Sequence, residues 1–342
     1  MKLKYQIGVV SVVVLFVIIF LNTLAFLQSN TNKNKSQYVD SYGMSAFSPK
    51  NDKDNNSKSE NLAVSSAESK SVSASLSSKF TPVSTLKLPV IMFHHINDLS
   101  DIPASDKIGI GLRVSPKAFD KQLNYLKENK YTTINMDDLY DYSQGSKALP
   151  NKPILLTFDD GYKDSFSKAL PILKKYNMIG DFAIITKVLG QNDYMTWDDV
   201  KAMKESGNSI SSHTQLHCSL AYPEGNSRTI FRPSPIVKEE SECPDMNYAA
   251  QMNTAQITGE LKKSKEILEK NLGNKVRAII YPFGHWNKQT EEIAKATGYS
   301  FGFTVIAQQN ENLDLNKPFA ISRYRANGQQ TEDLQGFFAG AR

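Results

Sequence analysis

The chain has 342 residues, 40% of them hydrophobic, so it is long enough for one large domain with a sizeable core plus appendages. Its formal net charge is +5, but residues 1–84 hold nine Lys/Arg against five Asp/Glu, which leaves thirty-one against thirty in residues 85–342. This near neutrality argues against a nucleic-acid partner, because phosphate binding needs a concentrated basic face. Cys218 and Cys243 are too few for a disulfide framework or a cysteine-rich zinc site, and they either form one bridge or stay free thiols.

The N-terminal segment predicts a membrane anchor. Residues 7–27 read IGVVSVVVLFVIIFLNTLAFL, carry no charge and are long enough to span a bilayer as a helix. Because Lys2 and Lys4 precede this span, we expect residues 1–6 to be a cytoplasmic tip and the rest of the chain to lie outside the cytoplasm. No convincing small-x-small cleavage site precedes Gln28, so we expect an uncleaved single-pass signal-anchor in the cell membrane; cleavage would give a secreted protein.

A polar segment follows the predicted span. Residues 28–80 contain 15 Ser, 7 Asn and 7 Lys, a composition too polar to bury a core of its own. We therefore expect residues 28–84 to be a flexible, disordered linker, and residues 85–342 to form the folded domain.

Short apolar runs alternate with helical patterns throughout that domain, as expected for parallel strands buried on both faces. The predicted strands are 88–93, 131–135, 153–158, 181–186, 208–212, 276–281, 300–306 and 319–324. Seven or eight βα units of this kind predict an α/β fold, a closed or nearly closed (β/α) barrel.

Helix boundaries support this reading. Ser115, Asp137 and Thr196 stand where helices are predicted to begin, and Gly207, Gly273 and Gly298 stand where helices are predicted to end. Residues 218–256 lack periodicity and hold four prolines, so we interpret them as a long insertion after the fifth strand.

Histidines and paired carboxylates follow the predicted strands. Because the carboxyl ends of barrel strands share the face that holds active sites, we expect these side chains to lie close together. They are His94 and His95 after the first strand, Asp159 and Asp160 after the third, His213 and His217 after the fifth, and His285 after the sixth.

This set predicts a metal site. Two histidines four residues apart, as in SHTQLH, suit one divalent ion, and a carboxylate completes a three-ligand site with open positions for water. We expect Asp160, His213 and His217 to be the ligands, and Asp159 to accept a proton as general base. The alternatives are an ordinary turn at Asp159–Gly161 and an incidental pair of surface or capping histidines.

Three motifs together resemble those of the polysaccharide deacetylases with a NodB-type domain, carbohydrate esterase family 4: TFDDG (157–161), HTQLH (213–217) and YPFG (281–284). The resemblance implies a distorted (β/α) barrel, a divalent ion such as Zn²⁺, and hydrolysis of acetyl groups from N-acetylglucosamine polymers or, less often, from xylan. It assigns Asp159 as general base, the same three metal ligands, and the backbone N–H of Phe283 as donor to the oxyanion.

The chain departs from the family pattern at two points. The third motif has no arginine to pair with the base, and we expect Arg323 to substitute from across the barrel. No histidine follows His285, so the general acid must come from elsewhere; VIMFHHI (90–96) resembles the opening of the poly-β-1,6-N-acetylglucosamine deacetylase branch and makes His94 the counterpart of its acid. Tyr281, Pro282, His285 and Trp286 are the expected substrate-binding residues.

We therefore expect a membrane-tethered, monomeric, metal-dependent enzyme that removes acetyl groups from N-acetylglucosamine units of a cell-surface polymer, either exopolysaccharide or peptidoglycan. Three alternatives remain: an acetylxylan O-deacetylase, an inactive carbohydrate-binding module on a stalk, and another metal hydrolase on a similar barrel. One metal ion per chain favours the deacetylase, and two ions favour the last alternative.

Overall fold

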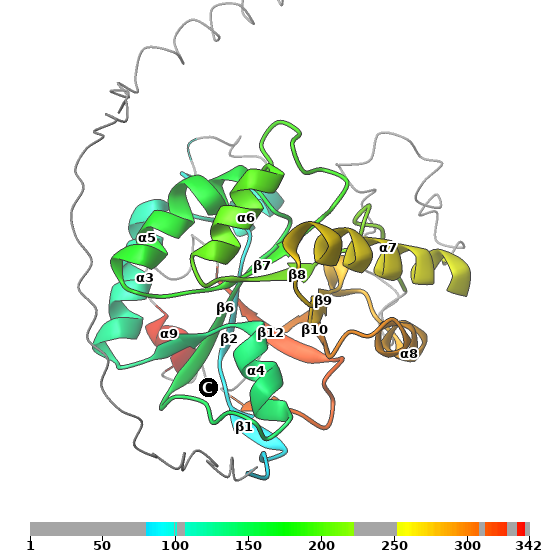
Figure 1. The fold of residues 1–342 in the computed structure, drawn as a ribbon. Helices are drawn as coiled ribbons and strands as arrows, with labels where there is room; N and C mark the ends of the chain where they lie inside the picture. The colour runs from blue at the N-terminus through cyan, green and yellow to red at the C-terminus, as the bar shows by residue number, and fades with distance from the viewer. Residues whose placement is uncertain are drawn as a thin grey trace, which may run out of the picture. The chain divides into compact units, whose positions relative to one another are not determined.

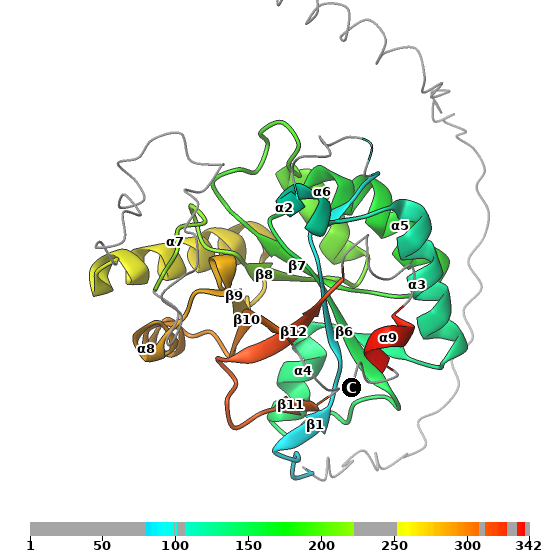
Figure 2. The same ribbon diagram turned by 180° about the vertical axis from the view of Figure 1, so that it is seen from behind.

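All eight predicted strands are present in the computed structural model, and seven of them close into a parallel barrel (Figures 1 and 2). The structure describes residues 80–98, 100, 107–221, 252–307, 312–326 and 334–338, all within the unit Ala74–Arg342. The eight strands are β2 (Val90–Phe93), β5 (Thr132–Ile134), β6 (Pro153–Phe158), β7 (Asp181–Ile184), β8 (Ser209–Ser212), β9 (Ala278–Ile280), β10 (Phe301–Ala307) and β12 (Ile321–Arg325).

The ring runs β2-β12-β10-β9-β8-β7-β6, and pairing of β2 with β6 closes it. Strand β5 stays outside the ring. It pairs with the first half of β6, from Pro153 to Leu155, whereas β7 pairs with β6 at Thr157 and Phe158. The predicted (β/α) barrel is confirmed, with seven strands in the ring and an eighth alongside it.

Two small sheets flank the barrel. Strand β1 (Thr85–Lys87) pairs antiparallel with β11 (Asn312–Asp314), and β3 (His95–Ile96) pairs parallel with β4 (Arg113–Val114). The helices are α2 (Lys107–Gly111), α3 (Pro116–Glu128), α4 (Met136–Ser143), the π-helix η2 (Ser165–Ala169), α5 (Leu170–Lys175), α6 (Trp197–Glu205), α7 (Thr254–Leu272), the 3₁₀-helix η3 (Pro282–Gly284), α8 (Lys288–Ala296) and α9 (Gln335–Phe338).

Local signals in the sequence set most helix ends. The side chains of Ser115 and Thr196 accept hydrogen bonds from backbone N–H groups in the first turns of α3 and α6, and Gly273 ends α7 in the left-handed conformation with φ 68°. One boundary differs from prediction: α4 begins at Met136 with Asn135 as its cap, so Asp137 lies inside the first turn.

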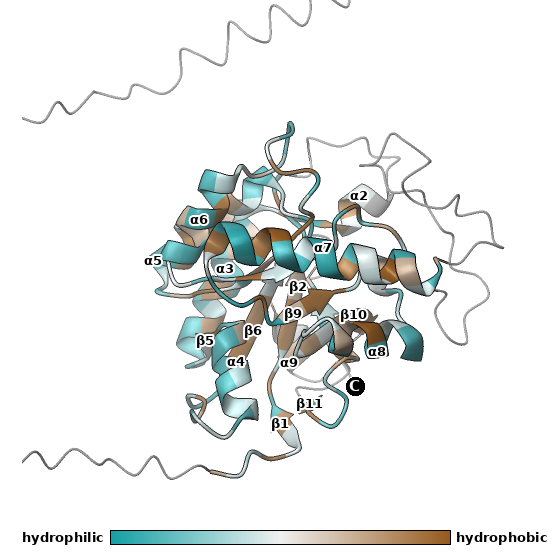
Figure 3. Cartoon of the chain, turned by 45° about the vertical axis from the view of Figure 1, so that its right-hand side comes forward, coloured by the Kyte–Doolittle hydropathy of each residue, from teal (hydrophilic) through white to brown (hydrophobic). Residues whose placement is uncertain are grey.

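Alternate residues of each strand face two separate cores. Ile91 and Leu156 belong to the cluster shared with helices α3, α5, α6, α7 and α8, which places them on the outer face of the barrel. Val90 and Leu155 belong to a second cluster inside the barrel. Helix α4 contributes buried side chains to this second cluster. Figure 3 shows the resulting pattern: several barrel strands are strongly hydrophobic, while the surrounding helices have mixed faces.

Several predicted segments lie outside the described residues: the tip at 1–6, the span at 7–27, nearly all of the linker at 28–84, and most of the insertion at 218–256. In the part of the chain that the structure describes, no helix combines the length and apolar character needed to cross a membrane.

Candidate active site

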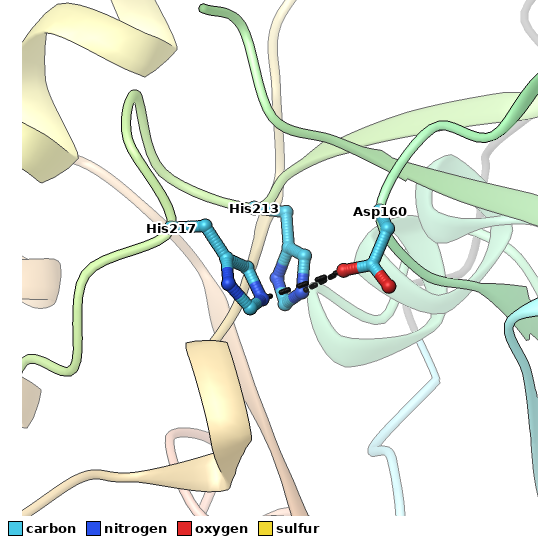
Figure 4. A group of neighbouring side chains, drawn as sticks. All are labelled: Asp160, His213 and His217. Carbon is cyan, nitrogen blue, oxygen red and sulfur yellow. Dashed lines mark ion pairs between the residues drawn. The ribbon is translucent and has the colours of Figure 1, made fainter. Parts of the chain in front are cut away.

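The three predicted metal ligands meet at the carboxyl ends of the strands. Asp160 follows β6, and both His213 and His217 follow β8 (Figure 4). The Nε2 atoms of His213 and His217 lie 3.1 and 3.4 Å from Asp160 Oδ1, and the three side chains are buried. Within the described residues, this is the group of His, Cys, Asp and Glu side chains arranged to hold a metal ion, with all ligand atoms within 4.8 Å of one another.

Residues with left-handed backbone conformation lie in both loops that carry the three side chains. Asp160 has φ 76° and Gly161 has φ 79°, while Thr214 and His217 have φ 65° and 59°. Such conformations cost on the order of 1–3 kcal/mol at each non-glycine residue and persist only where the surroundings enforce them. Asp160 and Gly161 thus form the turn together.

The histidine loop is held from two sides. The ring of His213 donates its Nδ1–H to the carbonyl of Ile280 at 2.7 Å, because a carbonyl can only accept, and this leaves Nε2 directed at Asp160. Behind the loop, the buried Glu260 accepts hydrogen bonds from the N–H groups of Gln215 and Leu216 at 3.1 and 2.9 Å.

Glu260 was missed in the sequence, although a signal was present. It lies one residue before Leu261 and three after Ile257, on the apolar face of α7, where an acidic residue needs a buried partner. Burial raises the pKa of Glu260, and the two backbone donors only partly offset this effect.

The three side chains of the cluster have shifted pKa values. Burial raises the pKa of Asp160, but the neighbouring His213 and His217 outweigh it and hold this pKa far below the usual range. Burial and the charge of His213 lower the pKa of His217 to about 3, so this ring is neutral. For His213, burial lowers the pKa, but the hydrogen-bonded carboxylate of Asp160 raises it overall.

The residues fit a tetrahedral metal ion. Zinc–ligand bonds of about 2.0–2.2 Å place neighbouring ligand atoms roughly 3.3–3.6 Å apart in a tetrahedral site. The His217 Nε2 to Asp160 Oδ1 separation of 3.4 Å lies within this range, and the His213 Nε2 to Asp160 Oδ1 separation of 3.1 Å is slightly shorter. Two neutral imidazole nitrogens and one carboxylate are also a donor set that zinc accepts.

Asp159 has a different partner from its neighbour. Arg323, with no exposed surface, donates from Nη1 to Asp159 Oδ1 at 2.7 Å and from Nη2 to Oδ2 at 2.9 Å. Its Nε–H is bonded to the carbonyl of Thr304, and Nη1 also donates to Thr157 Oγ1. Burial raises the pKa of Asp159, but Arg323 outweighs it, so the carboxylate stays ionised.

His94 stands across from this pair. Its Nε2 lies 3.8 Å from Asp159 Oδ2, too far for a hydrogen bond. Burial lowers the pKa of His94, and the carboxylates of Asp159 and Asp160 only partly offset this effect. A lowered pKa makes the protonated ring a stronger acid and reduces the fraction of His94 rings that carry the proton at pH 7.

The YPFG segment brings one predicted residue to the cluster. Phe283 has φ 58°, and its ring meets the His217 ring edge-on at a centroid distance of 4.7 Å. No hydrogen bond within the described residues occupies the Phe283 N–H.

The structure places the predicted substrate-binding residues in the core or against it. Tyr281 is fully buried in the outer core and Pro282 is also buried, so neither offers a face to a sugar ring. His285 is 4% exposed and hydrogen-bonded through Nδ1 to Ser219 Oγ at 2.7 Å. Trp286 is half-buried and packs against the outer core.

The cysteine alternatives are partly decided. Cys218, next to the candidate ligand His217, is buried and disulfide-bonded. Cys243, the other cysteine of the chain, lies outside the described residues.

Comparisons with known proteins agree with this geometry. Residues 146–302 match the family model described as polysaccharide deacetylase. The chain is 31% identical over 219 residues to YxkH of Bacillus subtilis, a protein named for this family, and 24% identical over 217 residues to the poly-β-1,6-N-acetyl-D-glucosamine N-deacetylase of Staphylococcus epidermidis. These matches cover 64% and 61% of this chain, and 64% and 67% of the relatives, so the chain spans slightly less than two thirds of YxkH.

A solved structure also matches. The Streptococcus pyogenes deacetylase PplD, in complex with acetate, superposes with a TM-score of 0.58 at 26% identity, over 74% of this chain and 96% of PplD. The barrel that holds the Asp160–His213–His217 cluster in this chain is thus similar to the fold of PplD, a protein named as a deacetylase. Residues 146–302, slightly less than half of the chain, are thus identified as a polysaccharide deacetylase domain, and the relatives and the barrel agree with this match.

Proposed function

We propose that this protein hydrolyses the acetamide groups of N-acetylglucosamine units in a cell-surface polysaccharide, with a divalent ion, Zn²⁺, held by Asp160, His213 and His217. The observation that carries the proposal is the buried three-ligand cluster with a separate, ionised carboxylate, Asp159, directly beside it. This arrangement provides a cation site and a base on adjacent residues, as amide hydrolysis requires.

A bound ion would supply Lewis acidity toward the acetyl carbonyl and the attacking water. Asp159 accepts a proton from that water, and the two hydrogen bonds from Arg323 keep its carboxylate ionised and oriented. The N–H of Phe283 donates to the oxygen that gains negative charge in the tetrahedral intermediate. His94 donates a proton to the leaving nitrogen, because an amide anion is too basic to depart at neutral pH.

The substrate class rests on the relatives. The Staphylococcus epidermidis protein is named for poly-β-1,6-N-acetylglucosamine, which supports an N-acetylglucosamine polymer rather than xylan. Residues 7–27 support a site outside the cytoplasm, on a membrane tether, and the disulfide of Cys218 fits an oxidising compartment. There, exopolysaccharide and peptidoglycan are the accessible N-acetylglucosamine polymers for a monomeric, tethered enzyme.

One assay tests this function. Acetate release is measured from β-1,6-linked and β-1,4-linked N-acetylglucosamine oligomers, peptidoglycan and acetylxylan, together with the number of metal ions per chain. We expect release from a glucosamine polymer and one ion, with Asp159→Asn as the inactive control. Release from acetylxylan alone indicates an O-deacetylase, sugar binding without release indicates a binding module, and two ions per chain contradict the proposed site.

A further inference from the structure

The His94 ring must be held in position by contacts that other residues make. His94 lies between β2 and β3, and within the described residues its ring makes no hydrogen bond. A proton donor must nevertheless come within about 3 Å of the atom that it protonates, and a misplacement of about 1 Å can cost roughly a hundredfold in rate. Some neighbouring contact must therefore fix this ring.

The next residue along the chain is held on three sides. His95 Nδ1 lies 2.8 Å from Asp164 Oδ2, and its ring stacks on that of Tyr162 at a centroid distance of 3.7 Å and an interplanar angle of 23°. Its backbone N–H donates to the carbonyl of Leu112 at 3.0 Å. The side chains of His95 and Asp164 are only 16% and 10% exposed, so competition from water is small.

Asp164 also forms a hydrogen bond with the backbone. Its second oxygen, Oδ1, accepts a hydrogen bond from the N–H of Ile96 at 3.3 Å, so a single carboxylate holds two consecutive residues. Asp164 belongs to the same short stretch as Asp159 and Asp160, immediately before η2. The carboxylate therefore ties the segment that carries His94 to the segment that carries the base and a metal ligand.

We propose that His95 and Asp164 are positioning residues that fix the His94 imidazole opposite Asp159. The proposal rests on the proposed function, in which His94 is the proton donor. His95 does not take that role itself, because its ring is engaged by Asp164 and Tyr162 and, in the described part of the chain, forms no hydrogen bond or ion pair with Asp159 or Asp160.

The test compares matched variants of the full chain. Asp164→Ala should lower kcat by about tenfold to a hundredfold, with KM and metal content close to wild type. His95→Asn, whose amide N–H can replace Nδ1–H toward Asp164, should stay near wild type, whereas His95→Leu should behave like Asp164→Ala. Asp120→Ala removes a surface ion pair with Lys175 and is the control for a lost carboxylate.

Two further readouts separate positioning from general loss of structure. In a His94→Ala background, Asp164→Ala should cause no additional loss, because residues that act through one group are not additive. In the metal-free protein, the imidazole NMR signals of His94 should shift or broaden in Asp164→Ala but not in Asp120→Ala. If Asp164→Ala does not fold, Asp164→Asn, which keeps one accepting oxygen, takes its place.

The outcomes distinguish this proposal from the proposed function. Wild-type turnover in Asp164→Ala, or a loss that adds fully to that of His94→Ala, overturns the positioning role while His94 remains the donor. Near-normal turnover in His94→Ala overturns the assigned proton donor and the positioning role together. Unchanged His94 signals in Asp164→Ala overturn the positioning role whether or not any substrate is cleaved.

Discussion

Asp159 and Asp160 are adjacent in sequence but have separate chemical environments. Asp159 faces Arg323, while Asp160, turned by its left-handed backbone, faces His213 and His217. Two neighbouring buried carboxylates can both stay ionised here because each has its own cationic partner or cation site.

This division predicts different losses on substitution. Asp159→Asn should keep the metal and lose about a hundredfold or more in kcat, because it removes only the base. Asp160→Asn, which has one fewer ionised ligand, should lose metal and activity together. Metal content by mass spectrometry and acetate release check both; turnover close to wild type in Asp159→Asn would refute the assigned roles.

Arg323 contributes to stability as well as to orientation. Arg323→Met leaves the Asp159 carboxylate buried without its partner, and we expect a loss of about 3–5 kcal/mol in the free energy of unfolding. The double variant Arg323→Met/Asp159→Leu should recover much of this loss, because it removes both charges. Urea unfolding measures the three proteins; equal destabilisation of the single and double variants would show that lost packing, not the unpaired charge, is responsible.

Metal affinity should depend on pH through His213. Burial lowers its pKa, but Asp160 raises it overall above the ordinary 6.5, so below that raised pKa a proton competes with the metal. We expect affinity to rise by roughly tenfold per pH unit between about pH 5 and the raised pKa, and then to level off. His217, with a pKa of about 3, adds nothing in this range. Calorimetric titration checks this; constant affinity across the range would contradict it.

At the scale of elements, local sequence patterns were enough to predict the strands and most helix ends. Apolar runs and capping residues such as Ser115 and Thr196 act within a few residues of themselves. The exclusion of β5 from the ring was not predictable, because it depends on how β5 and β7 divide the length of β6. Burial of Tyr281 was missed for a similar reason: its surroundings come from distant segments.

The turn at Phe283 offers a test at this scale. A Cβ at Gly284, where φ is 70°, would lie 2.5 Å from the backbone nitrogen of Val305, so Gly284→Ala must displace the turn. We expect a loss in kcat of about a hundredfold, the usual scale for losing an oxyanion donor.

Gly190→Ala is the matched control for this prediction. Gly190 has φ 81°, but a Cβ there meets no described atom within 4 Å, so it carries the same backbone strain without the collision. Equal effects of the two substitutions on kcat would remove the argument for the Phe283 N–H.

At the scale of the whole molecule, the sequence predicts a tether that the described residues do not include. We expect the full chain to remain in the membrane fraction and a chain that starts near residue 80 to be soluble and active, because residues 7–27 supply the apolar span. Fractionation and acetate release check both. Recovery from the medium of a mature protein that begins near residue 28 would contradict the anchor.

The place of β12 in the ring has a consequence for folding. This strand, late in the sequence, inserts between β10 and β2, the first strand of the ring, and it also brings Arg323 to Asp159. Before β12 pairs with its neighbours, the edges of β10 and β2 are unpaired and the Asp159 carboxylate lacks its counterion. A barrel without β12 is therefore little stabilised by becoming compact. Joining segments so far apart along the chain is slow. Ring closure and charge pairing therefore coincide in one late step, and the Asp159 carboxylate gains its arginine partner only when the barrel is complete.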